Sequence, residues 1–94
     1  MNNDYILSCY SSLIWQVAVR RYDELSEILE ELREIDSDCL ISVSEDYLIT
    51  YKGYAVHTEL LDDTEWEETI KVTINTESII VNDTYEIEQF LKKF

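Results

Sequence analysis

The chain has 94 residues, of which 21 are acidic and seven basic, so its formal net charge at pH 7 is -14. Direct binding to DNA or RNA is disfavoured, because affinity for nucleic acid comes largely from basic groups that neutralise phosphates. Disorder is also disfavoured, because 46% of the residues are hydrophobic and 12% aromatic, which is enough for the core of one small domain.

The first predicted element is a helix that begins at Asn3 or Asp4 and is apolar around most of its girth. Its apolar residues recur at helical spacing up to Val17, and a helix of this kind is typically buried. No charge occurs from Tyr5 to Val19, yet these 15 residues are too few and too polar for a membrane span, which takes about 20 mostly apolar residues. We therefore expect a core helix and no contact with a membrane.

The end of this helix is less well defined by the sequence. Arg20 and Arg21 would suit its last turn, because cations interact favourably with the negative end of the helix dipole. Trp15, Val17 and Val19 also alternate as they would in a strand. A strand at 15–19 is therefore the alternative to a continuous helix.

The second predicted helix runs from an Asp23 cap to about Ile35 and separates an apolar side from an acidic side. The apolar stripe has the helical period and consists of Leu25, Ile28, Leu29, Leu32 and Ile35. The opposite side carries a row of acids, Asp23, Glu27, Glu30 and Glu34, with Glu24 and Glu31 beside it. Nothing in the sequence between the two helices breaks a helix, so they could also fuse into one.

From Cys39 onward the apolar period changes to two, which indicates strands. The alternation predicts strands near 41–43, 47–51, 54–60, 66–74 and 78–81. Lys52-Gly53 fits a tight hairpin turn, and the positive φ of such a turn explains the one glycine of the chain. An acidic loop at 62–65 and a turn at 75–77 separate the later strands.

A closing helix is predicted at 84–93, where Asp83 and Glu86 make a capping box. One face of this helix is apolar and contains Ile87, Phe90, Leu91 and Phe94. The whole chain, 1–94, is thus predicted to be one α+β domain. Its antiparallel β-meander of four to five strands, at 39–82, packs against N-terminal helices at 3–35 and a short C-terminal helix.

No catalytic or metal-binding motif is recognisable. The spacing of His57, the sole histidine, from Cys9 and Cys39 matches no structural zinc pattern, and the acidic loop lacks the glycine of an EF-hand. The sequence has neither a nucleophile elbow nor a glycine-rich phosphate loop. We expect no enzymatic activity, no metal and no cofactor, with metal-dependent hydrolysis as the enzymatic alternative. The two cysteines are expected to be free thiols, and a Cys9–Cys39 disulfide is the alternative.

The acids are concentrated in two segments, which we take as the candidate partner-binding residues. Like charges at i,i+4 destabilise a helix by a few tenths of a kcal/mol each, so the acidic side of the second helix has no folding rationale. Its carboxylates repeat at about 5–6 Å, close to the roughly 6–7 Å between successive phosphates of a nucleic-acid strand. The acidic helix segment comprises Asp23, Glu24, Glu27, Glu30, Glu31, Glu34, Asp36 and Asp38. The acidic hairpin segment comprises Glu59, Asp62, Asp63, Glu65, Trp66, Glu67 and Glu68, with Trp66 as a possible aromatic anchor.

Surfaces of this kind indicate a positively charged partner, because complementary charge raises the rate of association. Basic grooves occur mostly in proteins that bind DNA or RNA. We therefore expect a small non-enzymatic inhibitor that occupies the basic groove of a nucleic-acid-binding protein as a nucleic-acid mimic. In size, charge and lack of catalytic motifs the chain resembles phage-encoded anti-CRISPR and anti-restriction inhibitors, uracil-DNA glycosylase inhibitors and nuclease immunity proteins. No motif of any one of these families aligns with it, so no residue role is carried over.

Two further interpretations stay open at this level. The chain could be an immunity protein or antitoxin that neutralises a basic nuclease or toxin. It could also be an acidic self-assembling module whose charge serves solubility, with a homodimer formed through the uncharged first helix. In the absence of an export signal we expect the protein in the cytoplasm, or in a host's cytoplasm if it is phage-encoded.

Overall fold

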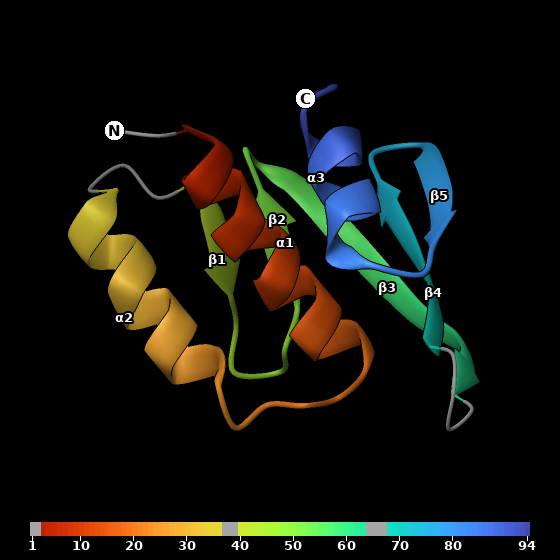
Figure 1. Cartoon of the computed structure of the whole chain (residues 1–94), viewed down its shortest axis with the longest axis horizontal. Coiled ribbons are helices and arrows are strands. Elements are labelled where there is room, and N and C mark those ends of the chain that lie inside the picture. The colour runs from red at the N-terminus through yellow and green to blue at the C-terminus, as the bar shows by residue number, and fades with distance from the viewer. Residues whose placement is uncertain (1–2, 37–39, 64–67) are drawn as a thin grey trace.

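The computed structural model describes residues 3–36, 40–63 and 68–94. Three helices and five strands follow in the order α1 (Asn3–Ala18), α2 (Leu25–Ile35), β1 (Ile41–Val43), β2 (Ile49–Tyr51), β3 (Tyr54–Asp63), β4 (Glu68–Ile74), β5 (Glu77–Val81) and α3 (Thr84–Leu91). The strands of this described part form one antiparallel sheet in sequence order (Figure 1). The α+β prediction, with a meander, N-terminal helices and a short C-terminal helix, is therefore confirmed.

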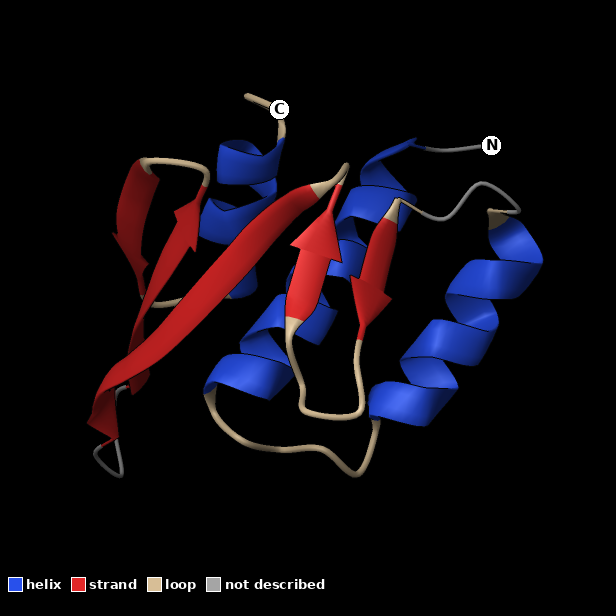
Figure 2. Ribbon diagram, turned by 180° about the vertical axis from the view of Figure 1, so that it is seen from behind, coloured by secondary structure: helices blue, strands red, loops and turns tan. Residues whose placement is uncertain are grey.

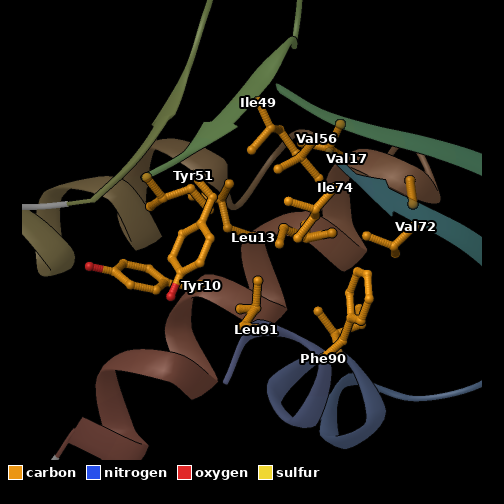
Figure 3. Close-up of a cluster of buried hydrophobic side chains, with 14 of the residues drawn as sticks. Tyr10, Leu13, Val17, Ile49, Tyr51, Val56, Val72, Ile74, Phe90 and Leu91 are labelled. Atoms are coloured by element: carbon orange, nitrogen blue, oxygen red, sulfur yellow. The ribbon is translucent and has the colours of Figure 1, made fainter. Parts of the chain in front are cut away.

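Helix α1 lies at the centre of the molecule and contacts α2, α3 and β3. Its side chains are buried on several sides, as expected for a helix that is apolar around its girth, and Figure 3 shows them between the strands and α3. Each fully buried large aliphatic side chain contributes about 1.5–3 kcal/mol. The buried residues of α1 are Tyr10, Ser11, Leu13, Ile14, Val17 and Ala18. The alternative of a strand at 15–19 is wrong, because the helix continues to Ala18.

A left-handed residue ends α1. Arg20 has φ 62°, its N–H donates to the Val17 carbonyl at 3.2 Å, and the Arg21 N–H donates to the Gln16 carbonyl at 2.9 Å. This pair of bonds is a Schellman motif, which satisfies the last carbonyls of a helix. Arg20 and Arg21 therefore follow the helix rather than forming its last turn, and α1 and α2 are not fused.

Helix α2 begins at Leu25, one residue later than the predicted Asp23 cap implies. Asp23 is not its cap: the preceding residue is Glu24, which makes no side-chain capping bond, and the Leu25 N–H donates to the Tyr22 carbonyl at 3.2 Å. The apolar stripe is turned inward as predicted, with Leu25 and Leu32 buried. Its remaining members, Ile28, Leu29 and Ile35, pack against the core from partly buried positions.

The sheet has one covered face and one open face. Helices α1 and α3 cover the first, where strand residues such as Val56, Val72 and Ile74 are buried. Figure 2 shows the opposite face with no helix in front of it. Short polar side chains dominate that face, and cross-strand hydrogen bonds join Ser42 to Thr50 and Thr73 to Ser78.

The first two hairpins differ in how well the sequence predicted them. Lys52 and Gly53 have φ values of 52° and 85°, which is the type I′ turn expected between β2 and β3. Tyr47, predicted as a strand residue, lies instead in the turn before β2 with φ 61°. There Ser44 and Leu48 are joined by a backbone bond of 2.9 Å, and Tyr47 occupies the left-handed third position where glycine is usual.

The third hairpin extends further than predicted. Asp62 and Asp63 were expected in a loop but pair with Thr69 and Glu68 as the end of β3 and the start of β4. The register shifts between Leu60 and Asp62, so Leu61 forms a bulge. Because the bulge interrupts the alternation of apolar and polar residues, the sequence pattern stops at Leu60 although the strand continues to Asp63.

Helix α3 has the predicted Asp83 cap and the predicted packing, but the return bond of the capping box goes to the N–H of Asn82 instead of Asp83. The Glu86 N–H donates to Asp83 Oδ1 at 3.0 Å, and Glu86 Oε2 accepts from the Asn82 N–H at 3.4 Å. Ile87, Phe90 and Leu91 are buried against the core. None of the described helices is both long and apolar enough to cross a membrane.

Replacing Arg20 by glycine should stabilise the fold. A left-handed conformation disfavours a residue with a Cβ by about 1–2 kcal/mol, and the larger unfolded-state entropy of glycine offsets about 0.5–1 kcal/mol of the gain. We expect a net gain of about 0.5–1 kcal/mol in the free energy of unfolding, or roughly 2–8 °C in Tm, measured by urea and thermal unfolding. Arg20→Ala is the control: it removes the same side chain but keeps the Cβ, so an equal gain in both variants would contradict the explanation.

Candidate functional site

The outward side of α2 is an exposed row of carboxylates. Glu27, Glu30 and Glu34 are all exposed, while the other side of the helix is turned towards α1. Within the described part of the chain these three side chains have no ion pair and no hydrogen bond. They lie within eight residues, so the first and the last are about 10 Å apart along the helix axis at 1.5 Å per residue. We call these three residues the α2 acidic face.

Two other members of the acidic helix segment have structural contacts. The phenol of Tyr5 donates to Glu31 Oε1, and the phenol of Tyr10 donates to Asp36 Oδ2 at 2.8 Å. The Tyr10 hydroxyl also accepts from the Leu40 N–H at 3.3 Å. Both tyrosines belong to α1, so these bonds fix α2 against it, and Glu31 and Asp36 are less available to a partner.

The remaining acids of this segment lie at its ends. Asp23 and Glu24 are exposed in the turn before α2, next to the α2 acidic face in sequence. Asp38 lies outside the described residues. Six of the eight predicted acids are thus exposed, and five of these six lie outside the Tyr5 contact, three of them on regular helix.

The contact of Glu31 with α1 alters two neighbouring groups. Its hydrogen bond, together with its negative charge, raises the pKa of Tyr5 to about 12. Burial, and secondly the charge of Glu31, raises the pKa of the Cys9 thiol, while a hydrogen bond with Tyr5 lowers it. Cys9 is a half-buried free thiol, as expected, and Cys39 lies outside the described residues.

The acidic hairpin segment is partly neutralised. Glu68 pairs with Arg21 (Nη2–Oε1 2.5 Å), and Glu59 lies directly across from Lys71 on the open face of the sheet. Asp62 is exposed at the end of β3. The Asp63 side chain and the predicted contacts at Glu65, Trp66 and Glu67 lie outside the described residues.

The two acidic segments do not form one surface. In Figure 1, α2 occupies the left edge of the molecule, and the ends of β3 and β4 that carry the hairpin segment lie at the lower right. The α2 acidic face is accordingly the stronger candidate, because Glu27, Glu30 and Glu34 make no ion pair or hydrogen bond within the described part of the chain, although Arg33 lies on the same helix.

Sequence reasoning missed a groove of about 520 Å³ beside β3. It is lined by Val17 and Ala18 at the end of α1, by residues 46–48 of the turn before β2, and by residues 56–60 of β3. Tyr22 and Tyr47 stack in it, with ring centroids 3.8 Å apart and planes inclined by 8°. The turn signal of Ser44-Glu45-Asp46 could have separated Tyr47 from β2 and indicated the groove.

No catalytic constellation accompanies these surfaces in the part of the chain that is described. No three His, Cys, Asp or Glu side chains of that part lie as a metal ion would need. His57 is exposed, on the open face of the sheet across from Thr73. Comparison of the chain with protein-family models, with curated proteins and with solved structures finds no match.

The Tyr5 contact predicts a pH dependence. The ordinary pKa of 10.0 is raised in the folded state to about 12, so the stability that this contact provides is present below pH 10 and is lost as pH rises from 10 to 12. Glu31→Gln should move the pKa of Tyr5 back towards 10, as read from the ¹³Cζ shift of labelled tyrosine. Glu34→Gln removes a charge from the same helix without touching Tyr5, and an equal shift in that variant would contradict the assignment.

Proposed function

We propose that the protein is a non-enzymatic inhibitor that binds the basic groove of a nucleic-acid-binding protein as a nucleic-acid mimic. The observation that carries the proposal is the α2 acidic face: Glu27, Glu30 and Glu34 are exposed in a row on a helix that packs against α1, and they make no ion pair with any residue that the structure describes. The net charge of -14 on the chain adds a long-range negative field to that of these three carboxylates.

Spacing and rigidity support this partner class. Side chains three and four residues apart on a helix are about 5–6 Å apart, which approximates the phosphate spacing along one strand. The bonds from Tyr5 to Glu31 and from Tyr10 to Asp36 hold the helix that presents this row. Because the backbone of this helix is already held in place, only the glutamate side chains lose conformational entropy on binding.

The location and partner follow from the same electrostatics. Basic grooves that read nucleic acid belong to effectors and nucleases of the cytoplasm, so the inhibitor would act there, or in the host's cytoplasm if it is phage-encoded. Because the carboxylates themselves are the recognition elements, the mechanism is stoichiometric occupancy and needs no cofactor.

The test removes the three charges without changing the shape of the helix. The variant Glu27→Gln/Glu30→Gln/Glu34→Gln should bind the partner about tenfold or more weakly and with a smaller dependence on salt, because fewer charges contribute. Its Tm should be unchanged or higher, because the repulsion of Glu30 and Glu34 at i,i+4 disappears. The partner is obtained by affinity capture on the immobilised wild-type chain, and binding is measured by titration at several salt concentrations.

The matched control is Glu45→Gln/Glu77→Gln/Glu88→Gln, which removes three charges that lie outside α2 and outside the lining of the groove beside β3. It should retain most of the affinity and the salt dependence of the wild type. A captured partner must also release the chain when duplex or single-stranded nucleic acid is added. Equal loss of binding in the two triple variants, or a partner that nucleic acid does not displace, would contradict the proposal.

A further inference from the structure

Strand β3 is much longer than its neighbour β2. Their register contains three pairs, the last joining Ile49 to Val56, whereas β3 continues to Asp63 and pairs with β4 along that length. The chain turns away at Leu48 into the turn before β2. In the described part of the chain, β3 therefore has no strand partner at residues 57–63 on its β2 side.

The main-chain groups of this edge point into the groove. The two-residue turn makes Tyr51–Tyr54 a hydrogen-bonded pair, and in antiparallel strands such pairs alternate with non-bonded ones. Val56 thus faces β2, and by the same alternation Thr58 and Leu60 direct their N–H and C=O groups to the same side. Val56, Thr58 and Leu60 all line the groove. Thr58 and Leu60 therefore offer main-chain hydrogen-bond donors and acceptors at the two-residue spacing of a strand.

The groove has an apolar floor and an ordered far wall. Its volume of about 520 Å³ lies in the range of about 300–1,000 Å³ that is usual for ligand sites. The far wall is the stacked pair Tyr22–Tyr47 with Leu48, which is 65% exposed. Hydrogen bonds from the N–H groups of Asp46 and Leu48 to Ser44 Oγ, at 3.3 and 3.1 Å, hold the turn.

Two of the four residues other than glycine that have positive φ in the described part of the chain line this groove. They are Arg20 and Tyr47, with φ of 62° and 61°, although each carries a Cβ. Such residues are strained and persist where the surrounding structure holds them, often at ligand sites.

We propose that this groove receives an extended segment of a partner protein, which adds to the sheet as a strand along the β3 edge. Unpaired main-chain groups at strand spacing recognise an extended polypeptide, and side-chain contacts in the groove select its residues. Asp46, Glu59 and Arg20 line the groove, and Lys71 lies across from Glu59, so the preference for a segment with basic residues beside apolar ones rests on the net charge of -14 of the whole chain. The proposal is independent of the α2 acidic face.

The probe is an acetylated and amidated hexapeptide of alternating valine and lysine, titrated into ¹⁵N-labelled full chain. We expect amide shifts at Tyr22, Tyr47, Thr58 and Leu60, and slower hydrogen exchange at the Thr58 and Leu60 N–H groups. Two analogues carry N-methyl groups either on the valines or on the lysines. Because a strand pairs through alternate residues, one analogue should bind like the parent peptide and the other at least tenfold more weakly.

A pair of charge-matched variants locates the site. Leu48→Lys places a cation at the groove mouth and should weaken binding of the basic peptide at least threefold. Ile80→Lys, at an equally exposed (59%) apolar position on β5, adds the same charge and should leave the affinity within about twofold. Circular dichroism and Tm of both variants verify that they are folded.

Three results would overturn the proposal. The first is a peptide that causes no shifts, or shifts confined to residues outside the groove, such as those of α2, β1 or β5. The second is equal binding by both N-methylated analogues, which would show that no edge pairing occurs. The third is a set of shifts at Thr58 and Leu60 that depends on protein concentration without peptide, which would assign the edge to a second copy of the chain. Since none of these measurements involves Glu27, Glu30 or Glu34, they leave the proposed function of the α2 acidic face untouched.

Discussion

Burial of α1 is the constraint on which the remainder of the structure depends. The helix is uncharged from Tyr5 to its end at Ala18, and it contacts α2 and α3 as well as β3. A helix with a single apolar stripe can pack against one neighbouring element, whereas a helix that is apolar around its girth can pack against three. The short strands and the two amphipathic helices are stable because each of them adds its one apolar face to this common core.

The distribution of charge follows from that arrangement. Since α1 supplies so much of the core, α2 needs only a narrow apolar side, formed around Leu25 and Leu32, and the rest of its surface is open to acids. The acids are divided by role: Glu31 and Asp36 bind tyrosines of α1, and Glu27, Glu30 and Glu34 face outward. Acids of α2 and of its C-cap thus both anchor the helix and form its exposed charged surface.

The spacing of apolar and polar residues predicted the features of the fold that depend on local sequence. The helix at Asn3–Ala18, the inward stripe of α2, the Lys52-Gly53 turn and the outward position of Glu30 all follow from spacing along the chain. The end of α1 and the turn before β2 do not, because Arg20 and Tyr47 occupy left-handed positions where the usual signal is glycine, and the chain has only one. The engagement of Glu31 by Tyr5 and the open edge of β3 depend on packing between distant segments and on unequal strand lengths, which local patterns do not encode.

The pairing of α1 with α3 fixes when the molecule can fold during synthesis. Every strand of the meander neighbours the next in sequence, so these hairpins can form as the polypeptide emerges from the ribosome. The core cannot close at that stage, because the helix at Asn3–Ala18 packs on the helix at Thr84–Leu91, some seventy positions later in translation. The nascent α1, the most apolar segment, therefore has to wait for nearly the whole chain, and it is the segment that a chaperone would need to shield in the interval.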